Sequence, residues 1–127
     1  MLVFVYGTLM QGEWNNDVLR SAEFIDTDQT APDFTLLHLG GFPAVIPTGD
    51  EGQSVRGEVF RVDNETLRNL DRLEGVPMLY TRESITLASG RQAYIYVLNS
   101  NRLRQQAPVI ESGDWRDRDH DRRATWQ

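Results

Sequence analysis

The chain has 127 residues, with 19 acidic against 13 basic side chains, a formal net charge of -6 and 39% hydrophobic residues. Its length fits one domain, and its hydrophobic content is sufficient for a buried core, which excludes a wholly disordered chain. The acidic balance argues against a general nucleic-acid binder or a membrane-surface binder, because both partners are anionic.

The sequence contains no cysteine, which excludes disulfides, thiolate metal sites and a cysteine nucleophile. No apolar run approaches the roughly 20 residues that a membrane-spanning helix needs. The apolar N-terminal run lacks the basic segment of a signal peptide and is too short for one. We therefore expect a soluble, cytoplasmic protein, and its size and acidic surface favour a monomer.

The first half of the chain predicts short strands and one short helix. Four segments have strand-like patterns bounded by glycine, proline or polar residues: residues 2–6, 23–26, 34–39 and 42–47. The first is a continuous apolar run that ends at Gly7, which is typical of a strand buried on both faces. A short helix is expected over residues 15–20, capped by Asn15 or Asn16.

The second half predicts the main helix between further strands. Strand patterns occupy residues 55–62, 81–87 and 92–98. Asp63 or Asn64 caps a helix in which leucine recurs at every third position, and Gly75 ends it. We expect residues 1–115 to form one domain, followed by a polar tail over residues 116–127 that docks in part and frays.

Together these elements predict an α+β fold. We expect a small mixed β-barrel of six or seven short strands, with one main helix and a short N-terminal helix. Such a domain has room for one core and one pocket.

One candidate site is the segment Tyr6-Gly7-Thr8-Leu9, where the buried strand stops. Glycine allows backbone torsions that other residues avoid, so that successive N–H groups can turn toward one concavity. Such a group of donors suits a carboxylate or an oxyanion, and Thr8 adds a hydroxyl. The alternative interpretation is an ordinary turn from strand to loop.

A second candidate is Glu74, which shares a helix face with Leu67 and Leu70 and therefore points inward by spacing. A desolvated carboxyl there has a raised pKa and can move a proton near neutral pH. The alternative is a side chain that turns to solvent or pairs with Arg72 or Arg82. The helix dipole disfavours a negative charge at this end, which favours the functional interpretation.

Other candidates are weaker. His120 lies among Asp117, Asp119 and Asp121, but their spacing matches no known metal motif. His38 lies in an apolar strand pattern and is interpreted as a structural histidine. We expect no metal and no cofactor.

Several segments, in order along the chain, carry a resemblance to a known family: residues 5–9, 57–60, 70–82, 94–97 and 110–115. The sequence Tyr-Gly-Thr-Leu followed at this distance by Leu-Glu-Gly-Xaa-Pro-Xaa-Xaa-Tyr resembles the gamma-glutamylcyclotransferase-like family. Within it, the chain is similar to small bacterial members of the short gamma-glutamylamine cyclotransferase branch.

The resemblance implies a small mixed barrel with a pocket at one mouth, and an enzyme that forms 5-oxoproline from a γ-glutamyl compound. It implies that Tyr6, Gly7, Thr8 and Leu9 hold the glutamyl group and that Glu74 is the catalytic glutamate. Tyr80 is expected to hydrogen-bond Glu74 or to line the pocket. The expected partner is a small-molecule γ-glutamyl substrate, with no nucleic acid and no membrane.

Two other classes of function remain open. One is a non-catalytic binding module that keeps the pocket for a γ-glutamyl or amino-acid-like ligand. The other is an interaction protein that uses the tail rich in arginine and aspartate. For the enzyme, we expect residues 40–54 to form the side of the pocket that faces the leaving amine.

Overall fold

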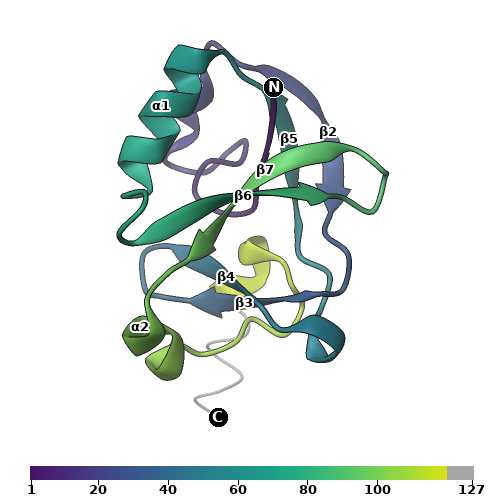
Figure 1. Ribbon diagram of the computed structural model, residues 1–127, viewed down its shortest axis with the longest axis vertical. Coiled ribbons are helices and arrows are strands. Elements are labelled where there is room, and N and C mark those ends of the chain that lie inside the picture. The colour runs from purple at the N-terminus through teal and green to yellow at the C-terminus, as the bar shows by residue number, and fades with distance from the viewer. Residues whose placement is uncertain (120–127) are drawn as a thin grey trace.

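The computed structural model describes residues 1–119, except for the side chains of residues 101 and 102. The strands and α-helices of this part, in chain order, are β1 (Leu2–Val5), β2 (Glu23–Gln29), β3 (Phe34–His38), β4 (Pro43–Pro47), β5 (Arg56–Arg61), α1 (Asn64–Leu73), β6 (Tyr80–Thr86), β7 (Gln92–Leu98) and α2 (Asn101–Gln106) (Figure 1). The α+β class and the number of strands agree with the prediction. Residues 120–127 of the expected tail, His120 included, lie outside the described residues.

The strands form two sheets. Five of them lie in the order β2-β5-β1-β7-β6, and β3 pairs with β4 in a separate two-stranded sheet. At the centre, β1 is antiparallel to β5 and parallel to β7. β4 begins and ends with proline, which lacks the N–H group needed to extend a ladder at either end.

The expected closed barrel is not seen in the described part of the chain. The outer strands β2 and β6 are not paired with each other. The residues that directly follow them, Thr30 and Leu87, form an isolated bridge. The sheet is therefore curled so that its two edges touch at one end without closing.

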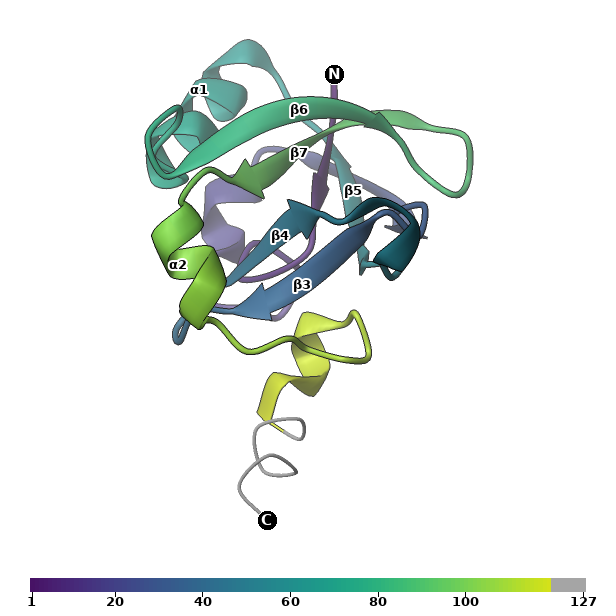
Figure 2. The same ribbon diagram turned by 60° about the horizontal axis from the view of Figure 1, so that its bottom comes forward.

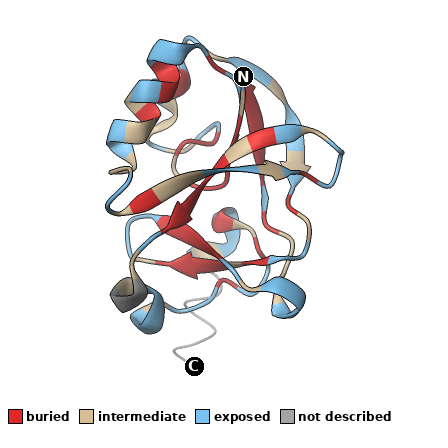
Figure 3. Cartoon of the chain, viewed as in Figure 1, coloured by how far each residue is buried: buried red, intermediate tan, exposed pale blue. Residues whose placement is uncertain are grey.

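Buried residues follow β1, β4, β7 and one face of α1 (Figure 3). They belong to one cluster, whose largest fully buried members include Trp115, Phe4, Leu36, Leu70 and Ile95. The segment after α2 runs along β3, where the Ile110 N–H donates to the Leu36 carbonyl at 2.9 Å (Figure 2). The C-terminal part of the described chain thereby covers the two-stranded sheet.

The ends of α1 follow the predicted signals. The Asp63 carboxylate accepts a hydrogen bond from the Thr66 N–H at 2.8 Å, which caps the helix. Gly75 has a φ of 65°, the left-handed conformation that commonly ends a helix. Glu74 is thus the last residue before the chain turns away from the helix.

Three local predictions need correction. The N-terminal helix is a short 3₁₀ turn over Asn16–Leu19, and the Asn15 side chain does not cap it. β2 extends beyond the predicted residues 23–26 because its pairing with β5 continues to Gln29. The sequence pattern did not predict α2.

No helix in residues 1–119 is long and apolar enough to cross a membrane.

Candidate active site

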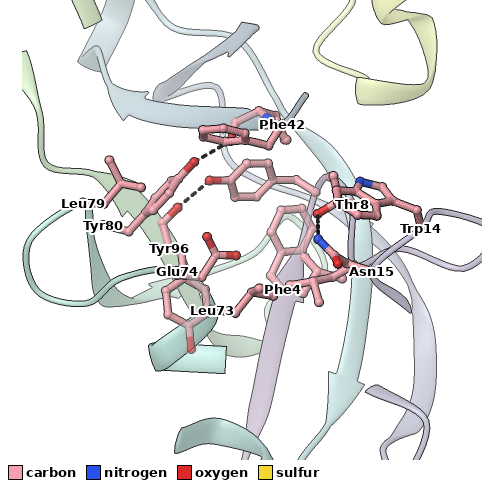
Figure 4. A pocket seen from close by; sticks show the side chains of 15 residues that line it. Phe4, Thr8, Trp14, Asn15, Phe42, Leu73, Glu74, Leu79, Tyr80 and Tyr96 are labelled. Carbon is pink, nitrogen blue, oxygen red and sulfur yellow. Dashed lines mark hydrogen bonds between the residues drawn. The ribbon is translucent and has the colours of Figure 1, made fainter. Parts of the chain in front are cut away.

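A cavity of about 330 Å³ opens beside the end of β1, between the start of β4 and the end of α1 (Figure 4). The six site residues predicted from the sequence all line it: Tyr6, Gly7, Thr8, Leu9, Glu74 and Tyr80. The fold thus brings together two segments that are more than sixty residues apart in the sequence.

Three tyrosines form the buried wall of this cavity. The Tyr6 hydroxyl donates to the Tyr96 carbonyl at 2.6 Å, and the Tyr80 hydroxyl donates to the Pro43 carbonyl at 2.7 Å. The Tyr96 hydroxyl donates to the Asp71 carboxylate at 2.7 Å. Burial raises the pKa of each of these tyrosines well above its usual range. Tyr80 therefore lines the cavity as a neutral group, and its proton is directed away from Glu74.

The Glu74 carboxyl forms no hydrogen bond or ion pair with the described residues. Arg82, one of the partners considered from the sequence, pairs with Asp71 at 2.6 Å. Arg72, the other, donates to Asn69. Burial raises the pKa of Glu74 from 4.5 to about 7, so the carboxyl can gain or lose a proton near neutral pH.

Gly7 is required for a reason different from the one predicted. Its φ is not in the left-handed region that only glycine enters readily. Instead, a Cβ atom at this position would lie 2.3 Å from Cγ of Pro43. The missing side chain lets the end of β1 approach the start of β4, and this approach shapes the cavity wall.

The segment after β1 offers unused donors. The backbone N–H groups of Gly7, Thr8 and Leu9 donate to no acceptor in the part of the chain that the structure describes. The Thr8 hydroxyl oxygen accepts a hydrogen bond from the Asn15 amide at 3.1 Å, which leaves the hydroxyl proton available to a ligand. A group of donors at a cavity suits a carboxylate or an oxyanion.

Two asparagines hold this segment in place. The Asn15 N–H donates to the Thr8 carbonyl at 2.9 Å, and the Asn16 side chain donates to the Leu9 carbonyl at 2.9 Å. The sequence pattern predicted only that one of these two asparagines caps a short helix. Their actual role depends on contacts across the loop, which a helix-capping pattern does not indicate.

The remaining lining residues are mostly apolar: Phe4, Val5, Trp14, Asn15, Phe42, Pro43, Leu73, Leu79 and Tyr96. Phe42 and Pro43 come from the stretch of residues 40–54 that was expected to form a pocket wall. The sequence analysis did not predict Trp14 as a site residue. The one feature that could have indicated it is a single tryptophan within a run of polar residues.

His38, the described one of the two histidines considered from the sequence, does not belong to the cavity. It is buried beside Trp115, with ring centroids 5.1 Å apart. Among the described residues there is no group of three or more histidine, cysteine, aspartate or glutamate side chains that could hold a metal ion.

Curated relatives extend over nearly the whole chain. A Vibrio cholerae protein named "Putative gamma-glutamylcyclotransferase" is 43% identical over 116 residues, covering 90% of this chain and 94% of its own. The Escherichia coli K12 "Gamma-glutamylcyclotransferase family protein YtfP" is 36% identical over 119 residues, covering 94% and 99%. The human "Gamma-glutamylaminecyclotransferase" is 41% identical over 88 residues, covering 64% and 58%.

Solved structures share the fold. A protein specific to uropathogenic E. coli has a TM-score of 0.81 at 25% identity and covers 94% of each chain. The mouse AIG2-like protein has a TM-score of 0.76 at 27% identity, covering 87% of this chain and 85% of its own. Residues 3–117 match the family described as "Gamma-glutamyl cyclotransferase, AIG2-like". The chain therefore belongs to the gamma-glutamyl cyclotransferase, AIG2-like family, in agreement with the resemblance of its motifs.

Proposed function

We propose that the protein cyclises the γ-glutamyl group of a small molecule to 5-oxoproline and releases the attached amine. The observation that carries this proposal is the Glu74 carboxyl, which is unpaired among the described residues and has a pKa raised to about 7. It lines the same cavity as the unused N–H groups of residues 7–9. Family membership supports the same class of reaction.

Binding of the glutamyl group follows from the donors at the end of β1. The N–H groups of residues 7–9 and the Thr8 hydroxyl hold the substrate's α-carboxylate or the oxyanion that develops on its γ-carbonyl. Nucleophile and electrophile belong to one molecule, so the main task of the cavity is to hold the folded conformer. The buried tyrosine wall keeps water away from that conformer.

Proton transfer is assigned to Glu74. The substrate's α-amine is an ammonium at neutral pH, and the Glu74 carboxylate removes its proton. The amine nitrogen then forms a bond to the γ-carbonyl carbon, and the bond from that carbon to the leaving nitrogen breaks. Glu74 returns its proton to the leaving nitrogen, and the attacking nitrogen, now positively charged, releases its second proton to water, so the products are 5-oxoproline and the free amine. No cofactor enters this sequence of steps.

The test is 5-oxoproline release by Glu74→Gln, with Glu51→Gln as the matched control. Glu51 is exposed and does not line the cavity, so its substitution makes the same change in charge elsewhere. We expect Glu74→Gln to lose activity by about 10²–10⁴-fold, the usual contribution of a general acid–base group. Thermal unfolding of each variant checks that the fold is intact.

Two results would contradict the proposal. An unchanged rate in Glu74→Gln removes this residue from the mechanism. Ligand-induced stabilisation of the wild-type protein by γ-glutamyl compounds, without turnover of any of them, indicates the non-catalytic binding module instead. For an active enzyme, we expect kcat/KM to rise with pH through about 7, as Glu74 becomes ionised in the free protein.

A further inference from the structure

The mouth of the cavity is lined by large apolar side chains that are left in water. Trp14 is 77% exposed, Leu73 45% and Phe42 39%, and all three line the cavity. The inner wall, by contrast, includes Phe4 and Tyr96, which are at most 3% exposed. A substrate whose γ-carbonyl lies at the donors of residues 7–9, with the rest of its glutamyl group toward the inner wall, must therefore extend its leaving group past the three exposed side chains.

The arrangement in space supports this orientation. Figure 4 shows Glu74 between Tyr80 and Tyr96 on one side and the group of Thr8, Asn15 and Trp14 on the other, with Phe42 above. Trp14 forms no ring contact with another aromatic residue in the described part of the chain. Its indole is thus free to cover a ligand, and covering apolar surface is favourable by about 25 cal/mol per Å².

The one charged group of the lining selects against an anionic leaving group. Among the described residues that line the cavity, Glu74 is the only one of the aspartate, glutamate, lysine, arginine or histidine type. A carboxylate on the leaving group would find no cation, and it would approach the charge of Glu74. An ammonium group would gain only a weak attraction from an exposed aromatic face, whereas an aryl or alkyl group gains from burial against all three side chains.

Trp14 is held between two anchored neighbours. On one side, the Glu13 carboxylate accepts a hydrogen bond from the Trp115 indole at 3.2 Å and pairs with Arg118 at 3.2 Å and Arg116 at 3.4 Å. On the other side, Asn15 is bonded to Thr8 through its backbone and its side chain. Because the backbone on both sides of Trp14 is held, the loop itself adds little to the cost of ordering when a ligand covers the indole.

From these features we infer that the leaving group is a neutral, apolar amine with an aromatic or long alkyl substituent, held between Trp14 and Phe42 at the mouth of the cavity. The inference rests on the proposed function for the identity of the glutamyl end. It assigns Trp14 and Phe42 as determinants of specificity for the leaving group.

The test uses γ-glutamyl amides that differ at the far end of the amine. Pentylamine, cadaverine and 5-aminopentanoate give neutral, cationic and anionic leaving groups of similar length, and phenethylamine gives an aromatic one. We expect kcat/KM for the pentyl and phenethyl amides to exceed that for both charged amides by about tenfold. Equal values, or a preference for either charged amide, overturn the inference while leaving the proposed function intact.

A failure of the proposed function gives a different result in the same experiment. Absence of 5-oxoproline from all four amides contradicts the cyclisation itself. Calorimetric titration with the same four amides then decides the inference, because the ranking of their affinities depends on the mouth of the cavity and not on turnover.

The role of Trp14 is tested with Trp14→Ala and Trp14→Phe, with Met78→Ala as the control. Met78 is 83% exposed and does not line the cavity. For the phenethyl amide, we expect Trp14→Ala to raise KM about tenfold and Trp14→Phe to restore most of the loss. For γ-glutamyl methylamide, whose leaving group carries only one methyl group, the loss in Trp14→Ala should be at least fivefold smaller. A loss of equal size for both amides overturns the assignment of Trp14.

Discussion

The ionisation of Glu74 links the chemistry of the cavity to the stability of the fold. Desolvation disfavours the charged carboxylate and raises the pKa from 4.5 to about 7. The position directly after α1 adds to this, because the carbonyl end of a helix repels negative charge. A group that is useful for proton transfer is therefore one that the folded protein holds at a cost.

This cost predicts how stability changes with pH. The folded protein keeps the Glu74 proton up to about pH 7, whereas the unfolded chain releases it near pH 4.5. Between these values the folded state binds more protons, so stability falls as pH rises. Glu74→Gln removes the effect, and we expect it to be more stable than the wild type by about 1–3 kcal/mol above pH 7.

The measurement is urea unfolding of both proteins at pH 4.5, 6 and 8. The advantage of Glu74→Gln should be small at the lowest pH and grow with each step. Glu51→Gln, the exposed control, should show no such trend. A difference between Glu74→Gln and the wild type that is the same at all three pH values would contradict the raised pKa.

Among the secondary-structure elements, the close approach of β1 to β4 depends on the absence of one side chain. A Cβ atom on Gly7 would lie 2.3 Å from Cγ and 2.7 Å from Cδ of Pro43. Both neighbours belong to a rigid ring, so the contact cannot be relieved by a rotamer change, and the two strands would have to separate. We expect Gly7→Ala to destabilise the protein by about 1–3 kcal/mol, the range for overpacking.

Gly41→Ala provides the control, because no atom lies within 4 Å of a Cβ built on Gly41 and its φ is not in the left-handed region. Chemical unfolding of both variants tests the prediction, and ligand binding to Gly7→Ala tests whether the cavity changes with it. A Gly7→Ala variant as stable as Gly41→Ala would show that the strands can separate without loss.

The elements differ in how well the sequence indicated them. α1 carries a capping aspartate, regularly spaced leucines and a terminal glycine, and each of these acts within about three turns of chain. α2 has six residues, too few for a repeated apolar spacing. Its one local signal is Ser100, whose hydroxyl accepts a hydrogen bond from the Leu103 N–H. That signal alone is common in turns and therefore indicates little.

At the scale of the whole molecule, the sequence predicted the strands but could not predict which strands pair with each other. Alternation of polar and apolar residues indicates which face of a strand is buried, but not which strand lies beside it. β1 pairs with β5 and β7, which follow it by more than fifty residues. For the same reason, the two candidate segments at residues 6–9 and Glu74 could be placed on one cavity only through a family resemblance, and Trp14 could not be placed at all.

The three tryptophans of the sequence include two in the described part, and their environments differ. Trp115 is 2% exposed, packs beside His38 and donates its indole N–H to Glu13, so it ties the segment around residue 115 to β3 and to the loop after β1. Trp14 is 77% exposed and lines the cavity. Stability and ligand recognition are thus assigned to different tryptophans.

We expect Trp115→Ala to lower the free energy of unfolding by about 3–5 kcal/mol, the usual cost of emptying a buried tryptophan site. Trp14→Ala should change it by less than about 0.5 kcal/mol, because an exposed side chain contributes little. Guanidinium unfolding compares the two, and Trp115→Phe, which leaves a smaller cavity, keeps the comparison possible if the alanine variant does not fold. Similar losses in the Trp14 and Trp115 variants would contradict this division, because the indole of Trp14 would then contribute to the core.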